Sequence, residues 1–178
     1  MSTDTSEQQA RRTTGRTFGG LLRALLPSLV VVVFLVWWQR GESQPVPTVD
    51  PRPDIAYAKR ISPTPLPAPG SLPGGWRATS SRVDAPSGEG RSPVTLSIGY
   101  LTPAERFAQL VVSDRPVGRV LQDSAPGATE DGAGPAGFER YRTARGEPAL
   151  VSQRGAVTIL VTGDAPIEDL ARLAESVR

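Results

Sequence analysis

The sequence predicts an α+β domain in which an antiparallel sheet of about six strands carries two helices on one face. Three observations favour this class. Segments with alternating apolar and polar residues recur between Trp76 and Thr162 and are typical of half-buried strands. Short turns that contain glycine or proline separate several of these segments, as in antiparallel neighbours. Apolar residues at helical spacing follow two of the strands, and the second such segment ends the chain.

An apolar stretch near the N-terminus predicts one transmembrane helix over residues 18–40. About 18 helical residues that rise ~1.5 Å each cover roughly 27 Å, close to the hydrocarbon thickness of a bilayer. An arginine at one end can reach the lipid headgroups, and two tryptophans suit the opposite interface. A cleaved signal peptide is the alternative, but the run lacks the small-residue cleavage site. The predicted membrane-anchor residues are Leu21, Arg23, Trp37 and Trp38.

Basic residues around this stretch predict the topology. Arginines at positions 11, 12, 16 and 23 precede its apolar core, whereas Arg40 follows it and Glu42 comes soon after. Because the more positive flank stays in the cytoplasm, residues 1–17 are expected to form a disordered cytoplasmic tail. The rest of the chain is expected to be extracytoplasmic. We therefore expect a single-pass protein of the cell membrane, with membrane lipid as its partner through the anchor.

Residues 41–71 are expected to form an extracytoplasmic stalk. They include eight prolines, a density that favours extended polyproline II geometry. One segment, Asp54–Arg60, has the spacing of a short helix, which we expect to pack on the domain. The domain itself is expected to span residues 72–178.

The first half of the domain is predicted to contain strands at residues 76–83, 94–100 and 107–112. Ser113 and Asp114 then predict the cap of a short helix, followed by a loop over 124–137. The second half is predicted to contain strands at residues 138–143, 149–153 and 156–162. Asp164 predicts the cap of the final helix, which is expected to lie on the sheet.

The two halves are similar in plan, since each gives three strands and then a helix. Residues 109–116 and 159–166 both run from a strand through Asp to Pro and into a helix. An ancient duplication would explain this similarity. A common local solution for turning a strand into a capped helix would also explain it, and we favour this second explanation.

Composition excludes several kinds of site. The chain has no Cys and no His, so it has no disulfide, thiolate nucleophile or Ser-His-Asp triad. From Leu72 onward, Arg residues and acids nearly balance, and their signs alternate along the chain. A nucleic-acid partner is therefore not expected, because it needs a basic face. We assign no catalytic, cofactor-binding or metal-binding residue.

Three groups of residues have a candidate chemistry. Gly132, Gly134 and Gly137 fit a dinucleotide-binding string, but a loop is predicted before them and a strand after them, where the site needs a strand and then a helix. The acidic pairs Glu130-Asp131 and Glu168-Asp169 suit solvation and helix capping better than calcium binding. Aromatic residues are expected in the core more than in a sugar- or lipid-binding groove; they are Trp76, Tyr100, Phe107, Phe138 and Tyr141.

Four of these segments together resemble a known family. They are Leu72–Ser80, Ile98–Pro103, the pair Ala149-Leu150, and Val161–Gly163 with the helix after it. The pattern is similar to an uncharacterised actinobacterial membrane family, domain of unknown function 4245, from about Leu21 to the end of the chain. The resemblance implies one N-terminal anchor and one outer domain, and implies nothing about activity. Tyr141 stands where the resemblance leads us to expect Trp.

The expected function is that of a membrane-anchored, extracytoplasmic binding or scaffolding module of the cell envelope, without catalysis. Its expected partner, besides lipid, is an envelope or membrane protein. The alternative is a carboxylate-dependent hydrolase of an envelope polymer, because the many acids offer pairs that could act together. Two acids in a cleft beside an exposed aromatic residue would favour the enzyme, and a filled core with a surface patch would favour the module.

Overall fold

The computed structural model describes residues 47–85 and 93–178, together with Leu29, Val31, Val32 and Phe34. Those four residues are helical, and the rest of the predicted transmembrane segment lies outside the described residues, as do the tail 1–17 and the anchor residues Leu21, Arg23, Trp37 and Trp38. None of the helices formed by the described residues has both the length and the apolarity required to cross a bilayer. The span and its topology therefore stay predictions.

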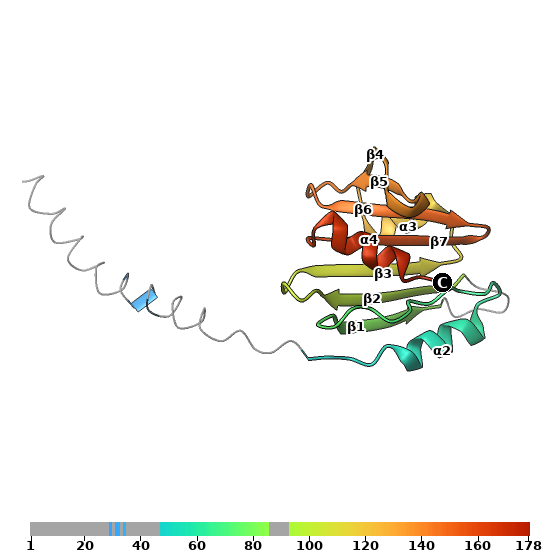
Figure 1. Cartoon of the computed structure of the whole chain (residues 1–178), viewed down its shortest axis with the longest axis horizontal. Coiled ribbons are helices and arrows are strands. Elements are labelled where there is room, and N and C mark those ends of the chain that lie inside the picture. The colour runs from blue at the N-terminus through green and yellow to red at the C-terminus, as the bar shows by residue number, and fades with distance from the viewer. Residues whose placement is uncertain (1–28, 30, 33, 35–46, 86–92) are drawn as a thin grey trace, which may run out of the picture. The chain divides into compact units, whose positions relative to one another are not determined.

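Within residues 47–85 and 93–178, seven strands form a single antiparallel sheet in the order β1-β2-β3-β7-β6-β5-β4 (Figure 1). The α+β class and the antiparallel sheet are confirmed. β3 and β7 are neighbours at the centre, and each is followed by a helix. The strands are β1 (Arg77–Asp84), β2 (Thr95–Leu101), β3 (Phe107–Ser113), β4 (Thr129–Ala133), β5 (Glu139–Arg142), β6 (Pro148–Arg154) and β7 (Val157–Gly163).

The strand that the sequence did not predict is β4. Its five residues, TEDGA, have no apolar alternation, and all but one of them are exposed. β4 pairs with β5 through a shifted register and lies at the edge of the sheet. Backbone pairing and the ion pairs of Asp131 with Arg140 and Arg142 of β5 hold it there, so no hydrophobic pattern marks it.

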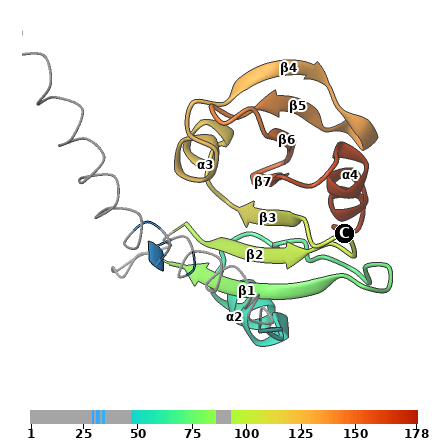
Figure 2. The ribbon, with the colours of Figure 1, turned by 90° about the vertical axis from the view of Figure 1, so that its left-hand side faces the viewer.

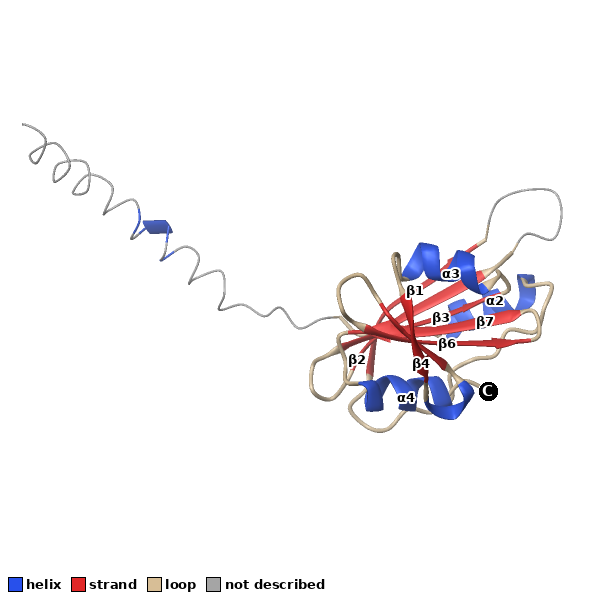
Figure 3. Ribbon diagram, turned by 90° about the horizontal axis from the view of Figure 1, so that it is seen from above, coloured by secondary structure: helices blue, strands red, loops and turns tan. Residues whose placement is uncertain are grey.

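The three α-helices described are α2 (Arg52–Ile61), α3 (Val117–Ser124) and α4 (Ile167–Glu175). α3 and α4 lie on opposite faces of the sheet, as Figures 2 and 3 show. α4 and α2 pack on the larger core, which includes Ile98, Leu110 and Ile159. α3 packs on a smaller core built on Val111 and Leu160. The expectation of helices on one face is therefore wrong.

Residues 47–71 do not form a free stalk, because they pack on the domain and belong to one compact unit, Val46–Arg178. The Val49 amide donates to the Ala78 carbonyl at 2.8 Å. Ala58 of α2 and Leu66 are buried in the larger core. The predicted short helix is confirmed, and α2 lies beside β1 (Figure 1). Residues 47–71 pack on the domain because the apolar side chains between their prolines are buried in the larger core.

The chain also closes on itself at its C-terminus. Ala68 and Arg178 exchange two backbone hydrogen bonds, with N–O distances of 3.1 and 3.2 Å. The Gly70 amide donates to the Ser176 carbonyl at 2.8 Å. These bonds hold the segment before β1 against the residues after α4.

Asp114 and Asp164 do not cap the helices that follow them. Pro116 and Pro166 occupy the N-cap positions, and neither helix has a side-chain cap. Instead, Asp114 Oδ1 accepts a hydrogen bond from the Val94 amide at 2.7 Å, just before β2. Asp164 Oδ1 accepts one from the Phe107 amide at 2.6 Å, at the start of β3. Each carboxylate thus joins the end of one strand to the beginning of its neighbour.

The duplication hypothesis conflicts with the faces of the central strands. The similar strings align Leu110 with Leu160, yet Leu110 belongs to the larger core and Leu160 to the smaller one. A rotation that exchanges the antiparallel neighbours β3 and β7 keeps each residue on its face of the sheet. The common local solution is therefore the better explanation.

Candidate functional site

The aromatic residues do not gather at one site. Phe138 and Tyr100 are buried in the larger core, as expected for most of the group. Tyr141 packs against the smaller core, and burial together with Glu139 raises the pKa of its hydroxyl. Phe107 is 41% exposed, which departs from the expectation of a core residue. Only Trp76 and Tyr100 meet, with ring centroids 6.2 Å apart in an edge-to-face arrangement.

The glycine string and the acidic pairs provide no site. The strand β4 precedes Gly134, and a single 3₁₀ turn, Pro135–Gly137, follows it. In the part of the chain that the structure describes, no α-helix begins directly after this string, so the dinucleotide motif lacks the helix N-terminus that would bind phosphate. Among the described residues, no group of three or more acids is placed to hold a metal ion. Asp131 instead forms ion pairs with Arg140 and Arg142 at 3.4 and 3.0 Å.

A groove of about 530 Å³ lies over β1, β2 and β3, beside α3, and we call it the polar groove. α3 covers only the part of this sheet face that lies over the smaller core. The uncovered part is lined by hydroxyl, amide and charged side chains. The lining residues are Ser80, Ser81, Arg82, Asp84, Thr95, Ser97, Gly99, Gln109, Arg115, Asp123 and Ser124.

The sheet register builds the floor of the polar groove in three rows. Ser80, Gly99 and Gln109 are opposite one another across the three strands. Arg82 is opposite Ser97 in the next row, and Asp84 is opposite Thr95 in the last. Directly opposite residues in a row lie about 4.5–5.5 Å apart at Cα. Short side chains on β2 keep the floor low, so the helix beside it forms a wall.

Gly99 is required at its place in the floor. A Cβ atom there would lie 2.5 Å from Ser80 Oγ and 3.1 Å from the Phe107 ring. The close approach of these two side chains over β2 depends on the missing side chain.

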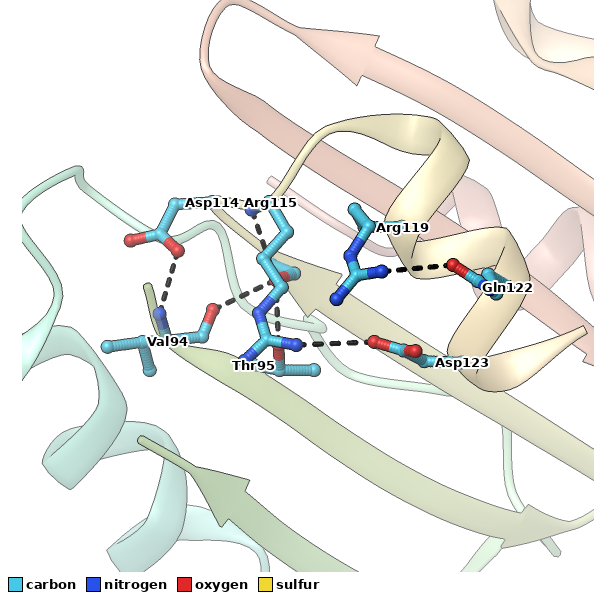
Figure 4. A network of polar contacts seen from close by, with 8 residues as sticks. Val94, Thr95, Asp114, Arg115, Arg119, Gln122 and Asp123 are labelled. Carbon is cyan, nitrogen blue, oxygen red and sulfur yellow. Dashed lines mark hydrogen bonds and ion pairs between the residues drawn. The ribbon is translucent and has the colours of Figure 1, made fainter. Parts of the chain in front are cut away.

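Arg115 forms the wall of the groove together with α3 (Figure 4). Its Nη1 donates to Asp123 Oδ2 at 3.2 Å, which ties the residue before the helix to its last turn. Its backbone amide donates to Ser113 Oγ, and Ser113 Oγ lies 2.7 Å from Thr95 Oγ1. Arg115 Nε is sealed from solvent and has no hydrogen-bond partner among the described residues. The network fixes the guanidinium position over β2.

This arrangement can recognise a polar ligand. Hydroxyl groups donate and accept hydrogen bonds, guanidinium groups only donate, and carboxylates only accept. Arg82 and Asp84 have exposed side chains on β1, and neither forms an ion pair within the described part of the chain. Both signs of charge are therefore offered to a ligand at one rim of the groove.

A second groove, of about 510 Å³, lies beside Trp76 and Tyr100, and we call it the aromatic groove. Its walls are the segment before α2, the first turns of α2, and the residues around β1. The lining residues are Thr48, Val49, Asp50, Pro51, Arg52, Ile55, Pro69, Gly70, Leu72, Trp76, Arg77, Ala78 and Tyr100. Burial raises the pKa of the Tyr100 hydroxyl to about 12, so this group stays neutral and can donate a hydrogen bond.

Sequence reasoning did not find either groove. The alternating Ser and Thr residues of β1 and β2 indicated a solvated face, and the same pattern is present in the floor of the polar groove. Arg115 and Asp123 form the wall beside this floor only because α3 is positioned there. The only trace of the groove floor in the sequence is that the polar side chains of these strands are short.

Comparison with known proteins identifies the family of this chain but does not indicate an activity. No curated protein matches the chain. The family model described as a protein of unknown function (DUF4245) matches residues 14–177, which is most of the chain. The resemblance to domain of unknown function 4245 is thereby confirmed, whereas its actinobacterial and single-pass membrane character stay predictions, and the chain belongs to the DUF4245 family.

Proposed function

We propose that this protein is a membrane-anchored binding module of the cell envelope and that the polar groove is its ligand site. The observation that supports this role is the groove itself, since its volume is in the range of small-ligand sites and its lining converges from three strands and a helix. The filled cores on both faces of the sheet agree with a rigid scaffold that presents this surface.

The ligand that fits this lining best is polyhydroxylated, such as an oligosaccharide of the envelope. Guanidinium, amide and carboxylate groups can each bind two adjacent hydroxyls, and the groove offers all three kinds through Arg82, Gln109 and Asp84. Its two arginines and two aspartates balance in charge. A neutral or weakly charged sugar therefore suits it better than a highly charged polymer.

A second candidate is the carboxylate-dependent hydrolase, which one observation favours. Asp84 and Asp123 both line the polar groove, so two carboxylates face the same bound ligand. Asp123 already binds Arg115 through Oδ2. If the chain cleaves an envelope glycan, Asp84→Asn and Asp123→Asn should each abolish cleavage while binding remains measurable. Cleavage by either variant would exclude this mechanism.

The experiment is a binding titration of the full chain, held in lipid nanodiscs, with a panel of neutral and acidic oligosaccharides prepared from bacterial envelopes. The variant Ser97→Trp places a large ring in the middle of the groove floor and is expected to lower affinity at least tenfold. Gln153→Trp, at an exposed position of β6, is the matched control and should bind as the wild type does. Equal affinity in both variants, or no binding by the wild type, would contradict the proposed site.

A further inference from the structure

We propose that the aromatic groove binds one acyl chain of a bilayer glycerophospholipid, with an ester oxygen of the lipid accepting a hydrogen bond from the Tyr100 hydroxyl. This inference goes beyond the proposed function, because it concerns a different groove and a different class of ligand. It rests on the predicted membrane span and on four features of the domain.

The first feature is a buried hydroxyl without a partner. Tyr100 is only 6% exposed, and its hydroxyl has no hydrogen bond within the described part of the chain. The side-chain atoms there that are both unpartnered and fully sealed are Ser81 Oγ and Arg115 Nε, so the Tyr100 hydroxyl still has contact with solvent. Tyr100 lines the aromatic groove, which is where this contact occurs. A ligand in the groove that brings an acceptor can therefore pair with this hydroxyl, which has no partner from the described residues.

The second feature is the apolar wall around this hydroxyl. Trp76, Leu72 and Ile55 line the groove and remain partly exposed although they pack against the larger core. Val49, which joins them in the lining, is 38% exposed. Burial of such surface by a hydrocarbon chain is favourable in proportion to its area. The ligand should therefore combine an apolar chain with an adjacent hydrogen-bond acceptor.

The third feature is a pair of arginines, Arg52 and Arg77, that line the same groove and form its charged rim. Arg52 is well exposed and forms only a long ion pair with Asp50, at 3.9 Å. Arg77 pairs with Glu105, and its side chain is 39% exposed. Both arginines line the groove and can donate to phosphate oxygens. A phospholipid thus matches the rim, the buried hydroxyl and the apolar wall in turn.

The fourth feature is the length of chain between the predicted span and the groove. Residues 39–46 separate Trp38 from the first continuous described segment, and Thr48 to Arg52 already form a wall of the groove. Eight residues reach about 28 Å at most, whatever conformation they adopt. If the predicted span crosses the bilayer, this length of chain allows the groove to reach the lipid headgroups, and bilayer lipid is for this reason the ligand that we propose.

The test uses the full chain in nanodiscs that contain phosphatidylglycerol with a photoreactive diazirine in one acyl chain. After irradiation, mass spectrometry locates the crosslinked peptides. We expect crosslinks in the 18–40 segment and, separately, in peptides that contain Leu72 and Trp76. Tyr100→Phe, which removes only the donor, should lower the groove crosslinks roughly five-fold, as expected for one net hydrogen bond, and leave those of the anchor unchanged. Leu72→Trp, which narrows the groove, should act in the same direction.

Tyr141→Phe is the matched control, because that hydroxyl bonds Glu139 and lies outside the groove. Crosslinks confined to the 18–40 segment would overturn the proposal, as would equal groove labelling in the wild type and Tyr100→Phe. Absence of crosslinks from both places would show that the predicted span is wrong. Ser97→Trp should leave groove labelling intact, so failure of the glycan site and failure of the lipid site are separately visible.

Discussion

Two aspartates that the sequence places before helices act between strands instead. Asp114 binds the amide of Val94, a residue only 1% exposed, and its other oxygen lies 3.3 Å from Ser62 Oγ. Asp164 binds the amide of Phe107 in a more exposed setting and also forms an ion pair with Arg106 at 3.3 Å. The Asp–x–Pro order is visible in sequence, but the donor of each bond lies in another strand. The cap assignment was wrong for this reason.

Removal of these carboxylates should destabilise the domain in proportion to burial. We expect Asp114→Ala to lower the free energy of unfolding by about 1–3 kcal/mol, because it leaves the Val94 amide unpaired in a buried place. Asp164→Ala should cost about 1 kcal/mol, since water can reach the Phe107 amide. Urea unfolding of the two variants measures both values. Glu175→Ala, an exposed charge removal at the end of α4, is the control, and a larger loss in it than in Asp114→Ala would contradict this account.

The Tyr100 hydroxyl should make stability depend on alkaline pH. Burial raises its pKa from 10.0 to about 12 in the folded chain, so the unfolded chain loses this proton first. The stabilisation is complete below pH 10 and is lost as pH rises from 10 to 12, by up to roughly 2.7 kcal/mol. Over that window the unfolding free energy of the wild type should fall by this amount relative to that of Tyr100→Phe, when the two are compared at several pH values. A constant difference between them would refute the prediction.

At the scale of elements, the sequence predicted those that carry a hydrophobic pattern. Six of the strands and all three described helices were predicted at or near their positions, because each contributes apolar side chains to a core. β4 was missed because its residues contribute none. The face that α3 covers was also mispredicted. Val117, Val120 and Leu121 show that this helix has an apolar side, but not which of two sheet faces receives it.

Two glycines should respond in opposite ways to substitution by alanine. Gly163 ends β7 with φ of 151°, and a Cβ atom there would lie 2.3 Å from the Phe107 carbonyl oxygen. Gly163→Ala is therefore expected to cost more than ~2 kcal/mol. A Cβ atom added at Gly118, in α3, would have nothing within 4 Å of it, so Gly118→Ala should stabilise by about 0.5–1 kcal/mol. Thermal unfolding of both variants checks the pair, and a shift of the same sign in both would contradict it.

The boundary of the domain can be tested by truncation. A fragment of residues 46–178 retains α2 and Leu66, which cover the larger core, whereas a fragment of residues 72–178 exposes that surface. We expect the shorter fragment to unfold at a temperature at least 10 °C lower, since burial of several apolar side chains is lost.

Within the longer fragment, Ala58→Asp should detach α2 and speed its amide hydrogen exchange, whereas Ala56→Asp, at an exposed position of the same helix, should not. Equal stability of the two fragments would restore the predicted boundary.

At the scale of the whole molecule, the sequence predicted the fold class and the charge balance of the domain, but not the two grooves. The polar groove needs Arg82 from β1, Ser97 from β2 and Asp123 from α3, which are distant in sequence. The aromatic groove needs residues 48–55 beside Tyr100, a contact that the stalk hypothesis did not include. Grooves depend on tertiary placement, whereas anchors and strands are marked by local patterns.

The predicted topology can be tested directly, because the chain has no native cysteine. Arg145→Cys, in an exposed turn of the domain, should be labelled in intact cells by a membrane-impermeant maleimide. Ser2→Cys, in the predicted cytoplasmic tail, should be labelled only after the cells are lysed. The reverse pattern would place the domain in the cytoplasm, and labelling of both before lysis would exclude a cytoplasmic N-terminus.

The backbone pairing of Ala68 with Arg178 has a consequence for biosynthesis. A ribosome makes Ala68 more than a hundred positions before it makes Arg178, so this pairing cannot form until Arg178 has been synthesised. A nascent or prematurely terminated chain therefore leaves the backbone groups of Ala68 and Gly70 without these partners. Chains that stop before Ser176 should lack these backbone bonds and be cleaved faster by proteases than the chain that includes Arg178.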